Sequence, residues 1–349
     1  MIKKTTLLLT LVSASLFAQE TTEEENKFSF SGSLDTYFRQ HLNGPNGSDA
    51  IAPSTSFANL NGFALGMANV IGSFESGKVG AVADLVFGPR GEDATFLSSV
   101  LRPEGSSNIV NQLYIYWNIS EKVKITAGNF NTFLGYEVIS PVDNFNYSTS
   151  YLFSYGPFSH TGIKADFTFS DDWSALVGVF NNTDATEFNF DNDYTVGAQL
   201  GYKSTYLNVI YGKQGGSTKA TFQIDLTAGY NLSENFYVGI NTSYNDTDGA
   251  AFYGAALYPQ YQISESFTLG LRGEYFAEAK EGVGAIGAYD DDGDASVLTF
   301  TVTGSYAIGD LIIKPELRLD TTSEDSFLDT DLNPTKSLTS IVVAGIYKF

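Results

Sequence analysis

The sequence of 349 residues has no cysteine, only two histidines and, beyond its N-terminus, no hydrophobic run of about twenty residues. Without cysteine, a disulfide framework, a thiolate zinc site, a cysteine nucleophile and a cysteine-linked lipid anchor are all excluded. Without a long hydrophobic run, an internal membrane-spanning α-helix is excluded as well. Lysine and arginine number 19 against 40 acidic residues, a formal charge of −21, and so acidic a chain is a poor partner for nucleic acid.

The N-terminus has the pattern of a secretory signal peptide. Lys3 and Lys4 precede an apolar stretch from Thr5 to Phe17, and the small residue Ala18 follows it. The alternative, a transmembrane anchor, needs about 20 apolar residues, and this stretch is too short. We therefore predict export with cleavage after residue 18, an acidic and disordered periplasmic tail over 19–26, and a folded domain over 27–349.

The folded part alternates between apolar and polar residues. Since 43% of all residues are hydrophobic, the chain can bury a large surface, and the alternation predicts β-strands with one polar face. It is clear from Phe28 to Arg39, and again at 79–87, 222–230 and 267–275. No internal stretch of ten residues favours a helical period.

Turns of two kinds separate these alternating runs. Four short segments share the order apolar, serine, acidic, any, apolar, and three weaker ones resemble them: 119–123, 169–173, 232–236 and 263–267, then 75–78, 203–205 and 309–310. Between them lie eight longer connections, near 40–60, 89–109, 132–160, 183–192, 214–220, 246–251, 279–294 and 321–337. Fifteen connections imply sixteen strands, with about 21 residues for each strand and its connection.

This arrangement predicts an all-β, antiparallel transmembrane β-barrel with short periplasmic turns and long extracellular loops. A soluble sandwich or solenoid is the alternative, but it needs no strict alternation of short and long connections. Closure of the barrel satisfies the backbone polar groups, as lipid requires. Aromatic residues near strand ends are then candidates for the interfacial girdles: Tyr202, Phe236, Tyr258, Tyr261 and Tyr347.

The last strand alternates from Ile341 through Val343, Gly345 and Tyr347 to a C-terminal Phe349. It resembles the terminal strand of Gram-negative outer-membrane proteins. That resemblance implies that Phe349 is an assembly signal for the barrel assembly machinery, and that the protein is located in the cell outer membrane.

The segment from Gly128 to Gly162 carries a more specific resemblance. Its motifs are 128–130, 135–137, 144–148 and 157–162, which read Gly-Asn-Phe, Gly-Tyr-Glu, Asn-Phe-Asn-Tyr-Ser and Pro-Phe-Ser-His-Thr-Gly. They resemble the OmpL-like β-barrel porin family of Bacteroidota, although Thr149 stands where a basic residue often follows the serine. The resemblance implies a water-filled outer-membrane porin for passive diffusion of small hydrophilic solutes, with no enzymatic activity, no catalytic residue and no cofactor or metal.

A sixteen-stranded barrel is too wide for side chains to fill, so we expect an aqueous lumen lined by the polar face of each strand. Charge facing lipid near the bilayer midplane costs a few kcal/mol, which favours the inward direction. Eight acidic and seven basic residues are therefore predicted to line the pore: Asp35, Arg39, Asp84, Lys122, Lys124, Lys164, Asp166, Asp225, Arg272, Glu274, Glu278, Lys314, Glu316, Arg318 and Asp320.

The longest connection, 132–160, is rich in phenylalanine and tyrosine, so an extended position in water is unfavourable. One hypothesis is that it folds into the lumen and narrows it. The other is that it packs as a lid over the barrel mouth. For the first hypothesis the constriction candidates are Glu137, Asp143, Tyr147, Tyr151, Phe153 and Tyr155.

Other functions fit the sequence less well. Ser148, His160 and Asp143 lie close in sequence, but proximity does not establish a nucleophilic triad. The acidic run 290–294 lacks the spacing of a calcium loop, so a solvated loop is favoured over weak divalent binding that bridges lipopolysaccharide. The alternative function is a barrel-scaffolded surface protein, an adhesin or an outer-membrane hydrolase, whose extracellular loops carry the activity.

The expected partners are outer-membrane lipid and lipopolysaccharide, the assembly machinery, small hydrophilic solutes and, in a homo-oligomer, further copies of the chain. The eight long connections hold 20 acidic and 5 basic residues, whereas the predicted pore wall is nearly balanced. We therefore predict a weak cation preference that the outer loops set.

Overall fold

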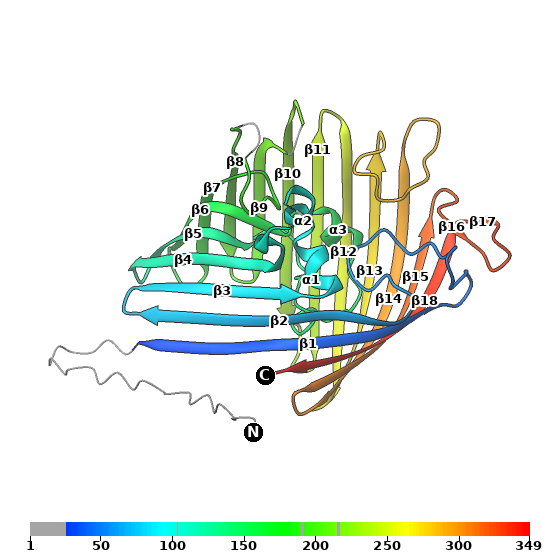
Figure 1. Ribbon diagram of the computed structural model, residues 1–349, viewed down its shortest axis with the longest axis horizontal. Coiled ribbons are helices and arrows are strands. Elements are labelled where there is room, and N and C mark those ends of the chain that lie inside the picture. The colour runs from blue at the N-terminus through cyan, green and yellow to red at the C-terminus, as the bar shows by residue number, and fades with distance from the viewer. Residues whose placement is uncertain (1–25, 103, 190–191, 215–216) are drawn as a thin grey trace, which may run out of the picture.

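The computed structural model describes residues 26–349 except 103, 190–191 and 215–216, and it is a closed antiparallel β-barrel of sixteen strands (Figure 1). The predicted strand count and fold class are confirmed. The predicted signal peptide and all of the predicted tail but Asn26 lie outside the described residues. The strands are β1 Lys27–His41, β2 Gly62–Ser76, β3 Val79–Phe87, β4 Val110–Ser120, β5 Val123–Asn131, β6 Ser159–Thr168, β7 Trp173–Phe180, β8 Thr195–Tyr202, β9 Thr205–Lys213, β10 Ala220–Asn231, β11 Phe236–Thr247, β12 Ala250–Ser264, β13 Phe267–Ala279, β14 Ala295–Ile308, β15 Leu311–Thr322 and β18 Ser337–Lys348.

The connections alternate as the sequence predicts, with one exception. All seven short turns join consecutive strands at the same end of the barrel. The exception is 246–251, predicted as a long connection, because β11 and β12 continue to a two-residue turn at Asp248–Gly249. Both turn residues have positive φ, 58° and 91°, as a tight hairpin with the order Asp-Gly requires. Polar turn residues alone did not distinguish this hairpin from a loop.

The remaining long connections carry the other elements. These are the helices α1 Pro89–Ala94, α2 Phe96–Leu101 and α3 Tyr151–Tyr155, a 3₁₀ turn at Ser106–Ile109, and a two-stranded ribbon of β16 Phe327–Leu328 with β17 Pro334–Thr335. Among the described residues, no helix has the length and apolar character needed to cross a membrane. In Figure 1 the three helices lie within the outline of the barrel.

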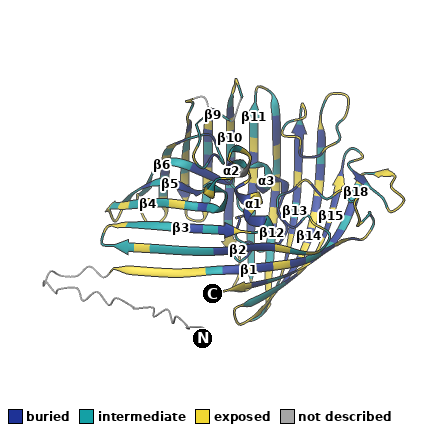
Figure 2. Cartoon of the chain, viewed as in Figure 1, coloured by how far each residue is buried: buried dark blue, intermediate teal, exposed yellow. Residues whose placement is uncertain are grey.

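The two faces of the barrel wall differ in chemistry. Large apolar side chains such as Leu113, Ile115 and Trp117 alternate along the outer face and are exposed. Figure 2 shows buried and exposed residues following one another along the strands. Both tryptophans, Trp117 and Trp173, lie near short turns on this outer face, as expected for an interfacial girdle. Tyr258, predicted as a girdle residue, is 1% exposed and stacks inside the barrel on Tyr136, so that prediction was wrong.

The barrel closes between β1 and β18. Gly32 and Phe349 exchange two backbone hydrogen bonds of 3.0 Å, so the C-terminal residue extends the ladder that joins the two ends of the chain. A side chain on Gly32 would collide with the Phe349 ring, because that ring lies over the glycine. The role of Phe349 as an assembly signal stays a prediction.

The orientation of the wall gives the first testable prediction. Ile163 is 51% exposed on the outer face of β6, and its neighbour Lys164 points to the inner face, where it pairs with Asp166. We expect Ile163→Arg to lower the free energy of unfolding in lipid vesicles by about 2–4 kcal/mol, because it places a charge in hydrocarbon. Lys164→Arg, one residue away at the same depth, is the control and should change it little. Urea titration followed by tryptophan fluorescence measures both, and equal losses would contradict the assigned faces.

Candidate functional site

The connection between β5 and β6, residues 132–158, lies inside the barrel, and we call it the inner loop. It contacts the wall in order around the lumen. Phe133 meets Gln199 of β8, Gly135 meets Asp225 of β10, and Tyr136 meets Tyr237 of β11. Beyond these, it reaches β13, β14, β15 and β1 through Arg272, Thr303, Glu316 and Asp35. A lid over the mouth could not make these contacts.

The depth of the inner loop follows from its contact with Lys314. This residue is the fourth of β15, which begins at a short turn, so it lies in the third of the strand nearest the periplasmic end. Its ammonium group donates to the backbone oxygen of Pro141 at 2.9 Å and also to that of Asn144. The inner loop therefore descends well below the extracellular rim.

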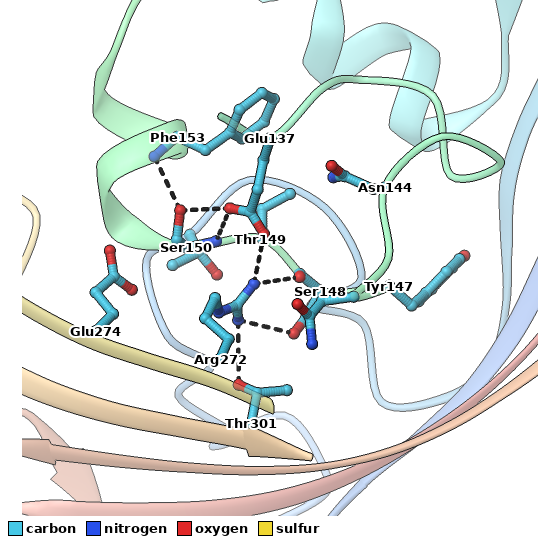
Figure 3. Close-up of polar contacts among 12 residues, drawn as sticks. Glu137, Asn144, Tyr147, Ser148, Thr149, Ser150, Phe153, Arg272, Glu274 and Thr301 are labelled. Atoms are coloured by element: carbon cyan, nitrogen blue, oxygen red, sulfur yellow. Dashed lines mark hydrogen bonds and ion pairs between the residues drawn. The ribbon is translucent and has the colours of Figure 1, made fainter. Parts of the chain in front are cut away.

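Arg272 on β13 is the centre of the anchoring network (Figure 3). It is fully buried and forms an ion pair of 2.7 Å with Glu137, and it donates to the backbone oxygen of Ser148 at 2.6 Å. Glu137 in turn accepts from the backbone N–H of Ser150 at 2.7 Å and from the Ser150 hydroxyl. One wall arginine thus joins two distant parts of the inner loop.

Two wall glutamates accept the backbone N–H groups of the same loop. Glu316 on β15 accepts from Tyr147 at 2.9 Å and from Ser148 at 3.2 Å. Glu274 on β13 accepts from Tyr151 at 3.0 Å and from Leu152 at 2.8 Å, at the first turn of α3. These donors have no partner within a helix or sheet, so the carboxylates satisfy groups whose burial would otherwise cost free energy.

Arg318 on β15 is a further wall residue that binds the backbone of the inner loop. It donates to the backbone oxygen of Thr149 at 2.9 Å and pairs with Asp320 at 2.7 Å, and both side chains are at most 1% exposed. Because the two charges are buried together and share several hydrogen bonds, their attraction offsets the cost of removing them from water. A single charge buried at this position would be destabilising.

Glycines on the wall make room for aromatic side chains of the inner loop. A Cβ on Gly197 of β8 would lie 2.7 Å from the Phe133 ring. A Cβ on Gly239 of β11 would collide with Tyr136, and one on Gly270 of β13 would collide with Phe145. The sequence analysis did not single out these glycines, because the side chains that cover them come from a distant segment.

Other wall charges hold other loops. Arg39 of β1 donates to the backbone oxygen of Ala58 at 2.8 Å, in the loop after β1. Glu278 of β13 accepts from the backbone N–H groups of Val283, Ala285 and Ile286 at 2.7 to 2.9 Å, which folds the 280–294 loop against the barrel.

Two buried aspartates have amide partners instead of basic ones. Asp84 of β3 accepts from Asn69, Asn111 and Gln112 at 2.5 to 3.0 Å. Asp225 of β10 accepts from Asn208 and Asn241 in the same way, and from Gly135 of the inner loop. Sequence analysis missed these asparagines, although each lies at a polar position of an alternating strand.

The predicted pore-lining residues fall into two groups. Eleven are at most 8% exposed, because a loop or a neighbouring side chain covers them: Asp35, Arg39, Asp84, Asp225, Arg272, Glu274, Glu278, Lys314, Glu316, Arg318 and Asp320. Four are partly or fully exposed: Lys122, Lys124, Lys164 and Asp166. Only this second group is positioned to meet a solute without a change in the loops, and a pore-lining role for either group stays a prediction.

The constriction candidates also differ in how far their side chains are exposed. Glu137, Tyr147, Tyr151 and Phe153 are at most 5% exposed and form the packed side of the inner loop. Tyr155 is half-buried, and its hydroxyl donates to the backbone oxygen of Ser54 at 2.8 Å, whereas Asp143 is exposed.

The structure does not assemble the triad considered above. Ser148 donates to Glu316, and Nε2 of His160 lies 2.9 Å from the Thr132 hydroxyl. In the part of the chain that the structure describes, no hydrogen bond joins Ser148 to His160, and no cluster of three or more metal-ligating side chains occurs. The acidic run 290–294 is a turn in which Asp290 accepts from the backbone N–H groups of Asp292 and Asp294.

Cavities lie on both sides of the inner loop. The outer one, of about 480 Å³, is lined by the loops after β1, β3 and β7 and includes Asp93 and Asp184. Burial raises the pKa of Asp184 to about 6, although two backbone N–H groups stabilise its carboxylate. The periplasmic cavity, of about 680 Å³, lies between Phe133 and Tyr136 of the inner loop and the walls of β8–β11.

A known protein family and several solved structures are similar to this barrel. A family model described as "Putative beta-barrel porin-2, OmpL-like" matches residues 27–349. Among solved structures, the outer membrane channel DcaP of Acinetobacter baumannii is similar with a TM-score of 0.59 and 12% identity, over 95% of this chain and 100% of that one. No curated protein matches the sequence.

OmpT of Vibrio cholerae is similar with a TM-score of 0.54 and 11% identity, over 95% and 100% of the two chains. Its in-vitro folded trimer form gives a TM-score of 0.55 and 11% identity, over 93% and 100%. At such identities these likenesses show the fold alone.

The buried anchors give the second prediction. Arg272→Ala leaves Glu137 without its ion pair, and the loss of one partner from a buried pair costs about 3–5 kcal/mol. We expect a comparable loss in the free energy of unfolding and faster proteolysis within the inner loop. Lys164→Ala breaks the partly exposed pair with Asp166 and, as the control, should cost about 1 kcal/mol or less. Urea titration and limited proteolysis measure both effects, and similar losses in the two variants would contradict the anchoring role.

Proposed function

Because the chain belongs to the OmpL-like β-barrel porin family, we propose that its inner loop is the element that sets the width of the pore. The protein is an outer-membrane porin for passive diffusion of small hydrophilic solutes. The observation that carries the proposal is the path of the inner loop, which lines the wall from β8 to β1 at mid-depth. A sixteen-stranded barrel without such a lining would enclose a much wider channel.

We assign the route for solutes to the two cavities. A solute enters between the outer loops, where Asp93 and Asp184 line the cavity, and leaves through the periplasmic cavity beneath Phe133 and Tyr136. The partly exposed wall charges Lys124, Lys164 and Asp166 lie in the periplasmic halves of β5 and β6.

Ion preference belongs to this proposal as well. Most charges of the wall are buried and hydrogen-bonded to loop backbone, to amide groups or to an opposite charge, so a mobile ion does not contact them directly. Exposed acidic residues of the outer loops, such as those at 290–294, remain to attract cations to the mouth. A weak cation preference results, opposed by the few exposed lysines of the wall.

The absence of enzymatic activity is also part of the proposal. It is supported by the separate partners of Ser148 and His160. The remaining partners predicted from the sequence, which are lipid, lipopolysaccharide and the assembly machinery, are expectations for an outer-membrane barrel. We also propose a homo-oligomer, supported by the solved trimer form of the similar OmpT barrel, and the mass of the purified protein in detergent would test it.

Removal of the inner loop tests its role as a constriction. Deletion of residues 140–156 takes away the segment anchored by Arg272, Glu274 and Glu316, and we expect single-channel conductance in planar bilayers to rise. Deletion of 325–333 in the outer ribbon of β16 and β17 is the control, because that segment lies in the last outer loop. An unchanged conductance in a folded 140–156 deletion would exclude the inner loop as the constriction.

Charge removal at the two ends of the barrel tests the ion preference. Asp291→Asn with Asp292→Asn removes two exposed charges from an outer loop, and we expect the reversal potential in a salt gradient to shift toward zero. Asp171→Asn with Asp172→Asn removes the same charge from a periplasmic turn and is the matched control. The shift should be larger at low salt, since screening weakens as ionic strength falls. Anion preference in the unmodified protein, or equal shifts from both ends, would contradict the proposal.

A further inference from the structure

We propose that the periplasmic cavity beneath the inner loop is a binding site for neutral, polyhydroxylated solutes of the sugar type. This inference rests on the porin function proposed above and names a class of solute for it. The cavity has a volume of about 680 Å³, within the range of about 300–1,000 Å³ typical of small-molecule sites. Every solute that leaves by this route passes its walls.

The lining combines aromatic rings with uncharged hydrogen-bonding groups. Tyr136, Tyr206 and Tyr237 supply rings and hydroxyls, and the side chains of Gln199 and Thr227 add an amide and a hydroxyl. Among the described residues that line the cavity, none carries a charge. The wall carboxylate Asp225, which accepts from the lining residue Gly135, is buried and bound to asparagines of β9 and β11.

Wall glycines hold two of these rings close to the barrel. A Cβ on Gly229 would collide with the hydroxyl of Tyr237, and one on Gly239 would collide with Tyr136. Tyr237 of β11 therefore lies across bare backbone of the adjacent strand β10, and Tyr136 of the inner loop lies across bare backbone of β11. Tyr206 is 36% exposed although it lies on the inner face of β9, so its side chain is accessible from the cavity.

The polar groups of the lining are held in place. The Tyr136 hydroxyl donates to that of Tyr237 at 3.1 Å, which leaves the Tyr237 proton available for a further acceptor. The Gln199 amide nitrogen donates to Asn208 at 2.7 Å and to the backbone oxygen of Phe133 at 3.2 Å. A few fixed polar groups on a mainly aromatic surface are what orients a small ligand.

This chemistry selects among solute classes. A sugar presents apolar C–H faces that pack on aromatic rings, and its hydroxyls both donate and accept hydrogen bonds. An ion finds no opposite charge in this lining. A hydrocarbon would take water from the Tyr206 and Tyr237 hydroxyls and offer them no hydrogen bond in return, which costs free energy. Neutral polyols and saccharides meet both requirements.

The test uses sucrose as the probe with the full-length mature protein in planar bilayers. Sucrose on the periplasmic side should cause concentration-dependent current interruptions in the unmodified channel. Tyr206→Ala removes an exposed ring, and we expect sucrose binding about tenfold weaker, the equivalent of about 1.4 kcal/mol. Tyr211→Ala, on the outer face of the same strand, is the matched control and should bind sucrose like the unmodified protein.

Two results separate this inference from the porin function. Conductance in potassium chloride alone is measured first, and its absence would overturn the porin function, while calorimetric titration of the protein in detergent with sucrose would still test the site. Open channels that sucrose does not affect, or equal sucrose binding in the unmodified protein and in Tyr206→Ala, would overturn the site and leave the porin function intact.

Discussion

The position of the inner loop depends on hydrogen bonds between its backbone and charged side chains of the wall. A loop inside a barrel is removed from much of the solvent, and it has no ladder to satisfy its N–H and C=O groups. Glutamates on β13 and β15 accept the N–H groups of Tyr147, Ser148, Tyr151 and Leu152. Lys314 and Arg318 donate to carbonyl oxygens of the same loop. The wall charges therefore supply hydrogen bonds that a sheet would otherwise provide.

Because of this arrangement, the charged residues of the wall have a different role from those that line an open pore. Wall charges of a porin are ordinarily considered for their effect on passing ions. Here most are buried in pairs or bound to backbone, so their fields are largely compensated within a few ångströms. The balance of acidic and basic residues on the wall serves the folding of the loop, and the accessible charge of the passage comes from elsewhere.

The sequence allowed the fold to be predicted almost completely, because strand alternation and turn residues are local signals. The sixteen strands and seven short turns follow from residues that are neighbours in the chain. The exception at Asp248–Gly249 shows the limit of that signal, since a polar turn of two residues and a short loop share the same composition. The inner face of each strand was also readable, as Arg272 and Glu316 show.

The inner-loop partners of that inner face were not readable, because they lie far from the wall residues in the sequence. Arg272 and Glu137 lie 135 positions apart, and Tyr147 and Glu316 lie 169 apart. The alternation pattern predicts that a side chain points inward, but it does not predict whether that side chain contacts water or a loop. The difference decides function, since an arginine in water attracts anions, whereas one paired with Glu137 holds a loop in place. The same limit applies to the glycines under Phe133, Tyr136 and Phe145. The role of each glycine can be recognised only when the aromatic side chain that packs on it is known.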